Sequence, residues 1–428
     1  MTTLLRLCYS LLLFLAIPLI FLRLLWRGFT QRGYWQNVSE RWGIFPRFNG
    51  GRCIWIHAVS VGEMRATQPL VKLLQSKYPD RPLLLSCMTA TGREIARELY
   101  GERATCIYLP YDLLFLQRRL IAHFHPQVLL VMETEIWPNL LAACRMDRVP
   151  AMLINARLSE RSFQGYMRFA PVRVLVRAAL ESLGVSAQFP SDADRLALLG
   201  APGPVVTGNI KFDVQIDAAL VSRGQEWRAK LASSKQVLLA ASTREGEDAL
   251  LLAAFTRCLT PEERAHILLV MVPRHPQRFD SVFQLIESTG LVAARRSSVL
   301  AHNDTQVWLG DSMGEMASYI AMCDVAFIGG SLLPLGGQNL IEACAQGKPV
   351  VMGPSTFNFS DASRLAVQAG AMQQCEDADA VMMAARQLLQ DAPLYAKAST
   401  AALRFAGEHA GATQKTMGLI APLLDGKN

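Results

Sequence analysis

From residue 53 onward the chain alternates short apolar runs with amphipathic stretches. The strand-like runs of the first half cover residues 53–59, 83–87, 104–109, 128–133, 151–155, 182–187 and 204–208. Helix-like stretches separate most of them. Continuous apolar strands that alternate with helices are typical of a parallel sheet covered on both faces. The pattern therefore predicts an α/β fold for this half of the chain.

The same pattern restarts after a polar, helix-prone stretch that follows residue 213. The new strand-like runs cover residues 236–242, 266–272, 305–310, 324–330 and 348–353. A chain of 428 residues also exceeds the size at which a single hydrophobic core stops growing. We therefore predict two Rossmann-like domains, residues 28–212 and 213–428, that face one another across a cleft.

The N-terminal segment has a different composition. Residues 7–22 contain no charged side chain and lie between Arg6 and Arg23. As a helix they would span roughly 24 Å, and extension to Trp26 with snorkelling arginines nearly reaches the ~30 Å hydrocarbon core. A signal peptide fits poorly because no small-x-small cleavage site follows, while a buried core helix is the other interpretation. We expect residues 1–27 to be a membrane anchor, spanning or half-inserted.

Charge and composition indicate which kinds of partner the protein binds. The net charge of +7 favours an anionic partner, which includes nucleic acid, acidic lipid and phosphorylated substrates. The sequence has no basic stretch interleaved with a platform of aromatic residues, which is the feature expected of a protein that binds nucleic acid. We therefore expect no nucleic acid as a partner. The excess of arginine after the apolar segment predicts a cytoplasmic body.

No metal site is expected from the sequence. The nine cysteines include no CxxC pair, and no Cys/His cluster has zinc-site spacing. Scattered thiols of this kind are typical of core residues in a reducing compartment. Two Asp-Ala-Asp tripeptides, residues 192–194 and 377–379, lie at predicted helix starts. Acids cap helices at such positions, and we interpret both tripeptides as caps.

Charged residues follow several predicted strands. Glu63 follows the first strand, Glu133 and Glu135 follow the fourth, and Lys211 follows the last strand of the first series. Ligands of open parallel sheets bind beyond the carboxyl ends of the strands, so these residues are candidates for chemistry. A simpler interpretation also stands for Glu63, because an acid in the first turn of a helix is favoured by the helix dipole.

The second half carries two candidate phosphate sites. In the run 329–353, glycines precede a predicted helix that begins at Gly336-Gly337, and free N–H groups at such a start attract phosphate. The run matches neither GxGxxG nor a P-loop, and the glycines could serve only to turn a loop. The other site is "GDSMGEM" (310–316), with Arg274 as a bidentate cation, although a surface ion pair would also explain that arginine.

Eight motifs, taken together and in this order, closely resemble the bacterial 3-deoxy-D-manno-octulosonic acid (Kdo) transferase family. The resemblance covers nearly the whole chain, including the apolar N-terminus. The motifs are "HAVSVGE" (57–63), "LPYD" (109–112), "METEIWPNL" (132–140), "INARLS" (154–159), "GNIKFD" (208–213), "VPRHPQRF" (272–279), "GDSMGEM" and "GPSTFNFSD" (353–361).

The resemblance implies a fold, a reaction and a set of site residues. The fold is GT-B, and the reaction passes Kdo from CMP-Kdo to the lipid A precursor, lipid IVA, with inversion at the anomeric carbon and without a cofactor. The expected location is the cytoplasmic side of the inner membrane. Glu63 matches the proton acceptor, and Glu133 and Lys211 match transition-state stabilisers. The positions that match CMP-contacting residues are Pro273, Arg274, Met313, Gly314, Glu315, Asn339, Leu340, Ile341 and Glu342.

The stretch 157–177 bears on the lipid partner. It carries Arg157, Arg161, Arg168, Arg173 and Arg177 among aromatic and aliphatic residues. Such a stretch can rest on an anionic membrane or bind acceptor phosphates. A solvated helix face is an equally good interpretation.

Two other functions are compatible with the pattern. One is a GT-B transferase that uses a UDP-sugar, which competition by CMP against UDP would distinguish. The other is a membrane-anchored binding protein without catalytic activity, which a turnover assay would distinguish.

Overall fold

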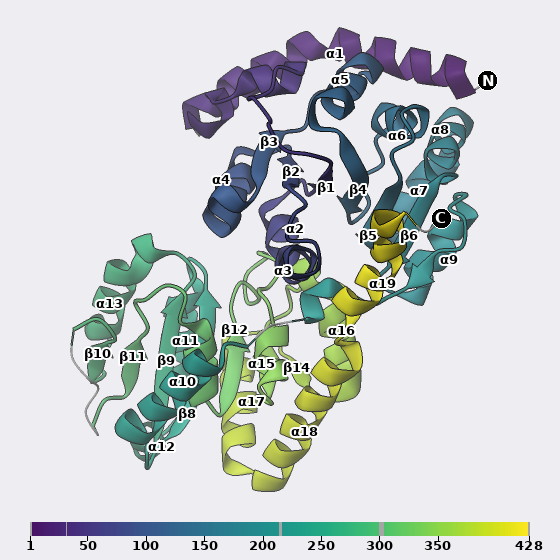
Figure 1. Ribbon diagram of the computed structural model, residues 1–428. Helices are drawn as coiled ribbons and strands as arrows, with labels where there is room; N and C mark the ends of the chain where they lie inside the picture. Colours follow the sequence, from purple (N-terminus) through teal and green to yellow (C-terminus); the bar gives the residue numbers. More distant parts are fainter. Residues whose placement is uncertain (1, 31, 214–215, 299–303, 427–428) are drawn as a thin grey trace. The chain divides into compact units, whose positions relative to one another are not determined.

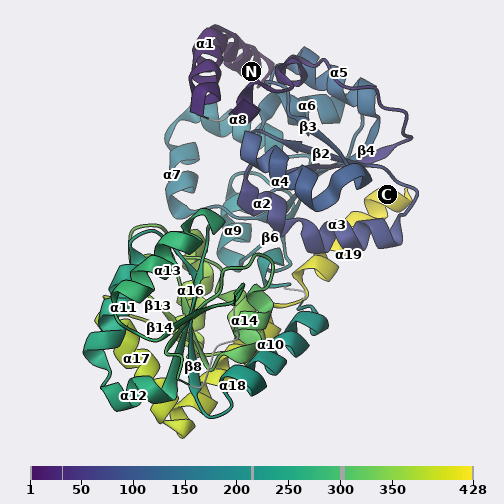
Figure 2. The ribbon, with the colours of Figure 1, turned by 90° about the vertical axis from the view of Figure 1, so that its left-hand side faces the viewer.

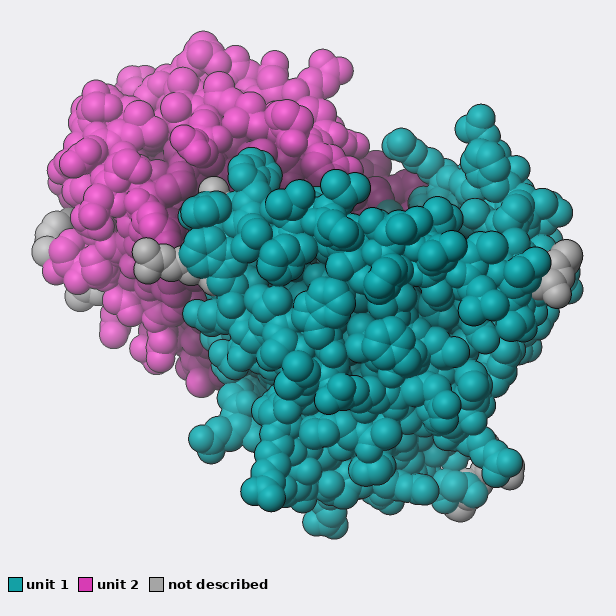
Figure 3. All heavy atoms as spheres, turned by 90° about the horizontal axis from the view of Figure 1, so that it is seen from above, with its two compact units in different colours: residues 1–213, 410–428 teal, residues 214–409 magenta. Residues whose placement is uncertain are grey.

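The structure is a computed structural model that describes residues 2–30, 32–213, 216–298 and 304–426. It divides into two compact units, coloured in Figure 3. Unit 1 comprises Met1–Asp213 and Ala410–Asn428, and unit 2 comprises Val214–His409. The C-terminal segment therefore groups with unit 1, whereas the sequence pattern places all of 213–428 in one domain. The reason is helix α19 (Ala412–Asp425), whose side chains Met417, Ile420 and Leu424 are buried in a core of unit 1.

Unit 1 contains a seven-stranded sheet in the order β3-β2-β1-β4-β5-β6-β7, and all of its strand pairs are parallel. Each predicted strand of the first series is present. The strands are β1 Cys53–His57, β2 Leu83–Cys87, β3 Thr105–Tyr108, β4 Pro126–Met132, β5 Ala151–Ala156, β6 Leu183–Ala187 and β7 Val205–Val206.

Alternate side chains of these strands form two separate cores, one on each face of the sheet. Trp55, Leu129 and Leu153 belong to one core, and their neighbours Ile54 and Leu130 belong to the other. Successive side chains of a strand point to opposite faces, so a strand buried on both sides reads as continuously apolar. This is why the apolar runs are recognisable without alternation.

Helices cover both faces of the sheet. In Figures 1 and 2, α3 and α19 lie side by side on one face, although they come from opposite ends of the chain. The helices of this unit are α1 Thr2–Thr30, α2 Val61–Ala66, α3 Gln68–Lys77, α4 Ala90–Tyr100, α5 Leu114–Phe124, α6 Pro138–Met146, α7 Glu160–Arg168, α8 Ala170–Leu180, α9 Pro190–Leu198 and α19. Short 3-10 turns occur at Arg32–Trp35 (η1), Val38–Trp42 (η2), Gly101–Arg103 (η3) and Ile210–Phe212 (η4).

Helix α1 lies along the outside of unit 1, beside α6 and α8 (Figure 1). Its segment Thr2–Phe29 is the one helix among the described residues that is long and apolar enough to cross a membrane, with a mean hydropathy of 2.3. One face of it packs on the unit, where Ile17 is buried against Tyr111, Leu113 and Leu116. Many of its leucines and phenylalanines are exposed, among them Leu11, Leu15 and Leu22, which excludes a buried core helix.

Unit 2 contains a second parallel sheet of seven strands, in the order β10-β11-β9-β8-β12-β13-β14. The five strands predicted from the second apolar series form its centre: β8 Gln236–Thr243, β9 Ile267–Pro273, β11 Val307–Leu309, β12 Val325–Ile328 and β13 Val350–Met352. The sequence pattern misses the two edge strands, β10 Ala293–Arg295 and β14 Met372–Gln374. Both are three residues long and only partly buried, so they produce no apolar run.

The helices of unit 2 alternate with these strands. They are α10 Ala218–Leu231, α11 Glu247–Cys258, α12 Pro261–His266, α13 Phe279–Ser288, α14 Met316–Met322, α15 Ile341–Ala345, α16 Ser360–Ala369, α17 Ala378–Gln390 and α18 Ala392–His409, with 3-10 turns at Pro276–Arg278 (η5) and Phe357–Phe359 (η6).

A buried ion pair ties the segment before β1 to the sheet of unit 1. Arg93 on α4 donates to both carboxylate oxygens of Glu40 at 2.5 and 2.8 Å, and the backbone N–H of Tyr108 donates to the same carboxylate at 2.8 Å. The two side chains are 6% and 4% exposed. Both charges are therefore removed from water and depend on each other.

We expect Glu40→Gln to destabilise unit 1 by about 3–5 kcal/mol, because it leaves the Arg93 charge buried and unpaired. Urea denaturation measures the change. Asp147→Asn is the matched control, since Asp147 pairs at 3.0 Å with Arg118, whose side chain is 52% exposed. The control should lose less than about 1 kcal/mol. Equal losses for the two variants would contradict the prediction.

Candidate functional site

Three of the charged residues predicted from the sequence meet at the carboxyl edge of the unit 1 sheet. Glu63 follows β1, Glu133 follows β4, and Lys211 lies in η4, after β7. Lys211 donates from Nζ to Oε1 of Glu133 at 3.0 Å. Glu63 lies near enough that the charges of both residues act on its pKa. The structure therefore brings together a carboxylate and an ion pair.

Glu63 is held by the first turn of α2. Ser60 caps this helix, because its Oγ accepts from the N–H of Glu63 at 3.3 Å and donates to Oε1 of the same residue at 2.7 Å. The N–H of Val59 donates to Oε2 at 2.8 Å. Burial raises the pKa of Glu63, although these hydrogen bonds oppose the rise. The residue thus makes the contacts of a helix-start acid and also has the proton affinity that suits a base.

The backbone at this edge adopts unusual conformations. Glu133 has a φ of 54° and Asn155, in β5, has a φ of 53°, both in the left-handed region. Non-glycine residues in this region carry strain, and such strain is concentrated at functional sites. Asn155 is buried, and its Oδ1 accepts from the N–H of Ile210 at 2.9 Å.

Asn155 and Asn209 together position Lys211. Oδ1 of Asn209 accepts from the N–H of Lys211 at 3.0 Å, one residue after the bond that Asn155 makes to the same turn. The sequence alone does not identify either asparagine as a functional residue. The available signal is a polar residue at the end of the apolar run "AMLIN" (151–155), where a core strand has no other use for an amide.

Glu135 is a third carboxyl group at this edge. Burial and the nearby Glu63 carboxylate raise the pKa of Glu135 to about 7. Like charges in a partly buried site disfavour ionisation of both groups. Glu135 therefore retains its proton to a higher pH than an exposed glutamic acid does.

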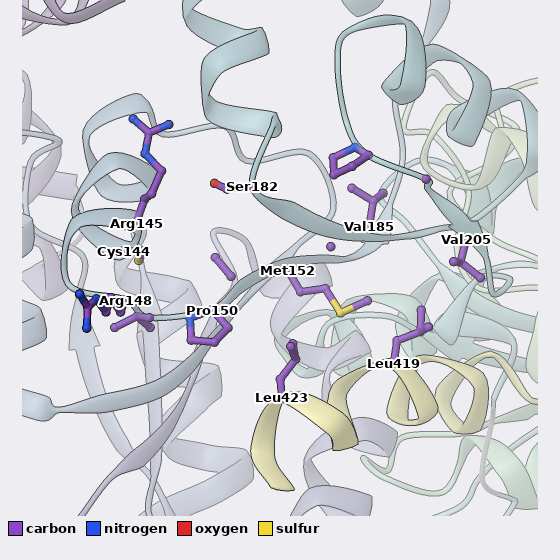
Figure 4. Close-up of a pocket in the computed structure, with 15 residues that line it drawn as sticks. Cys144, Arg145, Arg148, Pro150, Met152, Ser182, Val185, Val205, Leu419 and Leu423 are labelled. Carbon is purple, nitrogen blue, oxygen red and sulfur yellow. The ribbon is translucent and has the colours of Figure 1, made fainter. Parts of the chain in front are cut away.

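A hollow of unit 1 lies away from this cluster. This cavity, of about 480 Å³, is lined by the residues that begin β5, β6 and β7 and by α19 (Figure 4). Its wall includes Arg145, Arg148, Met152, Val185 and Leu423. It therefore opens at the amino edge of the sheet, opposite the edge that carries Glu63, and does not belong to the charged cluster.

In unit 2, the residues expected at the donor site also follow strand ends. Pro273 ends β9 and Arg274 follows it. Asn339 donates from Nδ2 to Oε1 of Glu342 at 3.1 Å and accepts from the N–H of Ile341 at 3.0 Å. Burial raises the pKa of Glu342, while the Asn339 hydrogen bond and the charge of Arg274 oppose the rise. Arg274 and the segment with Asn339, Leu340, Ile341 and Glu342 thus lie close together.

Met313, Gly314 and Glu315 follow β11, the neighbour of β9 in the sheet. Met313 is exposed and Gly314 has a φ of 79°, so the turn needs a glycine there. Glu315 pairs with Arg223 at 2.8 Å and with Arg296 at 3.4 Å. This third expected segment lies at the same edge of the sheet as the other two.

The glycine-rich run differs from its prediction in two ways. Helix α15 begins at Ile341 and not at Gly336-Gly337, so Glu342 lies on the helix while Asn339 precedes it. The N–H groups of Gly330, Ser331 and Leu332 are also not free, because they donate to the carboxylate of Glu247. These three N–H groups, which precede the predicted helix start, are therefore not available to a phosphate. Sequence reasoning does not find Glu247.

The acidic tripeptides have structural partners. Asp377 caps α17 by accepting from the N–H of Ala380 at 2.8 Å. Asp192 lies in the first turn of α9 and accepts from the N–H of Leu158 at 2.8 Å. Within the part of the chain that the structure describes, no three His, Cys, Asp or Glu residues are grouped so that they could hold a metal ion.

Comparison with known proteins identifies relatives over most of the chain. A family model described as 3-deoxy-D-manno-octulosonic-acid transferase matches residues 36–214. A 3-deoxy-D-manno-octulosonic acid transferase of Bordetella pertussis is 41% identical, over 92% of this chain and 95% of its own length. A protein of the same name from Haemophilus influenzae is 34% identical, over 98% of this chain and 99% of its own length.

A solved structure supports the fold. The crystal structure of a glycosyltransferase from Rickettsia africae matches with a TM-score of 0.54 at 15% identity, and the match covers 88% of this chain and 99% of that one. At this identity the similarity concerns the fold alone, and it agrees with two Rossmann-like units of the GT-B type.

The raised pKa of Glu135 predicts a pH dependence of stability. A carboxyl whose pKa is higher in the folded state stabilises the fold fully below its unfolded pKa, and this contribution is lost as the pH rises through the folded value. For Glu135 the loss falls between about pH 4.5 and pH 7. We expect Glu135→Gln to lose less stability over this interval than the unmodified protein, as measured by urea denaturation at a series of pH values. Identical pH profiles would refute the assignment.

Proposed function

Because the chain belongs to the Kdo transferase family of glycosyltransferases, we propose that it transfers Kdo from CMP-Kdo to the lipid A precursor lipid IVA, with Glu63 as the base. The observation that carries the proposal is the cluster of Glu63 with the Glu133–Lys211 ion pair at the carboxyl edge of unit 1. Both a proton acceptor and a cation are needed for this transfer, and the cluster supplies both.

The transfer is a single displacement with inversion. A hydroxyl oxygen of the acceptor forms a bond to the anomeric carbon of Kdo, while the bond from that carbon to the phosphate oxygen of CMP breaks. The proton of the hydroxyl passes to the carboxylate of Glu63. The raised pKa of Glu63 makes its carboxylate a stronger base than an exposed one, and its hydrogen bonds from Val59 and Ser60 hold it in place.

Lys211 and Glu133 act on charges of the sugar. Kdo carries a carboxylate next to the reacting carbon, and the ammonium of Lys211 is a suitable partner for it. Positive charge develops at the sugar ring as the bond to CMP breaks, and the negative carboxylate of Glu133 stabilises this charge. The ion pair holds both groups in place before substrate binds, with each side chain 26% exposed and so accessible.

Unit 2 binds the donor nucleotide in this proposal. As CMP leaves, its phosphate gains negative charge that the guanidinium of Arg274 stabilises. Glu342, which accepts from Asn339, is proposed to accept hydrogen bonds from ribose hydroxyls as well. Pro273 and the turn with Met313, Gly314 and Glu315 complete the CMP site. A single phosphate requires less neutralisation than a diphosphate, so the proposal includes no metal ion.

Helix α1 attaches the enzyme to the cytoplasmic side of the inner membrane in this proposal. Leu13, Ile17, Ile20 and Leu24 recur at helical spacing and face unit 1, so the opposite face is left for lipid. A helix with one face on protein and one on lipid lies half-inserted. The arginines of α7 and α8 then face an anionic surface.

Glu63→Gln tests the base. General-base catalysis contributes about 10²–10⁴-fold, so single-turnover transfer should fall at least roughly hundredfold, while CMP affinity should not change because the CMP segments lie in unit 2. Ser60→Ala removes the helix cap and one hydrogen bond to the Glu63 carboxylate, at a cost of about 1 kcal/mol, but leaves the base, so transfer should fall by less than in Glu63→Gln. A transfer rate of Glu63→Gln within about tenfold of the unmodified protein would reduce Glu63 to a helix-start acid. Competition by CMP but not by UDP would exclude a UDP-sugar donor.

The exposed face of α1 is tested by replacing Leu11, Leu15 and Leu22 with Gln. These leucines are 59%, 64% and 61% exposed, and each buried leucine contributes about 1.5–3 kcal/mol in lipid. We expect binding to phosphatidylglycerol vesicles to fall by orders of magnitude, with thermal stability retained. Ile17→Gln, on the packed face, should have the opposite effect: it should lower the thermal stability and leave vesicle binding unchanged. Undiminished binding of the triple variant would contradict the proposal.

A further inference from the structure

The turn after β8 contacts two of the segments of unit 2 that are proposed to bind the donor. One contains Arg274, and the other is the glycine loop that leads to Asn339. The backbone carbonyl of Thr243, the last residue of β8, accepts from the N–H of Arg274 at 3.0 Å and from Nη1 of Arg278 at 3.0 Å. Arg274 is thus held by backbone to this turn. Four residues later, Glu247 begins α11.

The carboxylate of Glu247 is fully buried and accepts four backbone hydrogen bonds. Its Oε2 accepts from the N–H groups of Arg244 at 2.8 Å and Gly330 at 2.6 Å. Its Oε1 accepts from the N–H groups of Ser331 and Leu332, each at 2.9 Å. A carboxylate offers about four lone-pair sites, so backbone donors use the full capacity of this one. Glu247 therefore behaves as an internal anion within the glycine loop.

Close approach of two strand ends makes this geometry possible. A Cβ atom on Gly329, after β12, would lie 2.5 Å from the carbonyl oxygen of Ser242 in β8. Only glycine permits that distance, and Ser242 itself has a left-handed φ of 56°. The approach delivers the next three N–H groups of the loop to Glu247.

The loop then closes on itself immediately before the second donor segment. The N–H of Gly337 donates to the carbonyl of Gly330 at 2.6 Å, and the N–H of Gln338 donates to the carbonyl of Gly329 at 3.0 Å. The next residue is Asn339. The position of Asn339 and Glu342 thus depends on the position of the loop. The position of the loop depends in turn on its hydrogen bonds to Glu247.

We propose that Glu247 is a positioning residue of the donor site. Its carboxylate sets the backbone of the loop from Gly330 to Gly337 and so aligns Asn339 and Glu342 with Arg274, which the same turn holds. It follows that the N–H groups of Gly330, Ser331 and Leu332 do not bind the donor phosphate. The inference rests on the proposed function, because it assumes that these segments bind CMP.

The test is CMP affinity of the full-length chain by calorimetry. Glu247→Gln keeps the size of the side chain, but its NH₂ group faces two N–H donors that then lack an acceptor. We expect CMP affinity to fall roughly tenfold or more as the loop rearranges. Arg274→Ala is the positive control for a residue that contacts the nucleotide.

Asp324→Asn is the matched control for a purely structural role. Asp324 lies before β12, at the opposite edge of the same sheet, where Oδ2 accepts from the N–H of Val237 at 2.7 Å and from Arg228 at 2.8 Å. It should lower the melting temperature and leave CMP affinity within about twofold. If Glu247→Gln also binds CMP within twofold, the inference is wrong. If the unmodified protein does not bind CMP, the proposed function itself fails.

Hydrogen exchange of the unmodified protein provides a second test that does not depend on a variant folding. The amides of Gly330, Ser331 and Leu332 should be protected before CMP is added, because Glu247 already binds them. CMP should therefore add little protection to this loop while it protects the segment from Asn339 to Glu342. Strong new protection of residues 330–332 on CMP binding would show that the ligand uses these amides and would overturn the inference.

Discussion

Because all strand pairs in both sheets are parallel, every strand of a sheet delivers its carboxyl end to the same edge, and the rest of the molecule depends on this constraint. Glu63, Glu133 and Lys211 are separated by as many as 148 positions in the chain, which is the difference between 211 and 63, yet they meet at one edge. The same constraint brings Arg274 near Glu342 in unit 2. An antiparallel sheet would send half of these residues to the opposite edge.

The buried and half-buried carboxylates illustrate how partners separate structural from reactive roles. Glu40 and Glu247 have their oxygens occupied by an arginine or by backbone N–H groups, and such satisfied groups hold segments in place. Glu63 accepts fewer hydrogen bonds and is affected by two neighbouring charges. Burial and the nearby Glu63 carboxylate raise the pKa of Glu135 to about 7. A carboxylate suited to proton transfer is one that the fold buries without fully satisfying.

Much of the fold is predictable because burial on both faces leaves a continuous apolar signal. The central strands of both sheets and the exposed apolar helix at the N-terminus are recognisable in this way. The two edge strands β10 and β14 are not, since three partly exposed residues produce no run. The return of α19 to unit 1 is also missed, because an amphipathic helix does not specify which apolar surface it covers.

The sequence by itself determined which chemical groups stand at strand ends, because a charged residue directly after an apolar run has no place in the core. On that basis the order of residues alone makes Glu63, Glu133, Lys211 and Arg274 candidates. Only the tertiary structure decided which of these groups are neighbours, what their partners are and how their pKa values shift. Glu247 shows the reason most clearly. In the sequence it is an ordinary helix-start acid, and its role exists only because Gly329 lets a loop more than 80 residues away reach it.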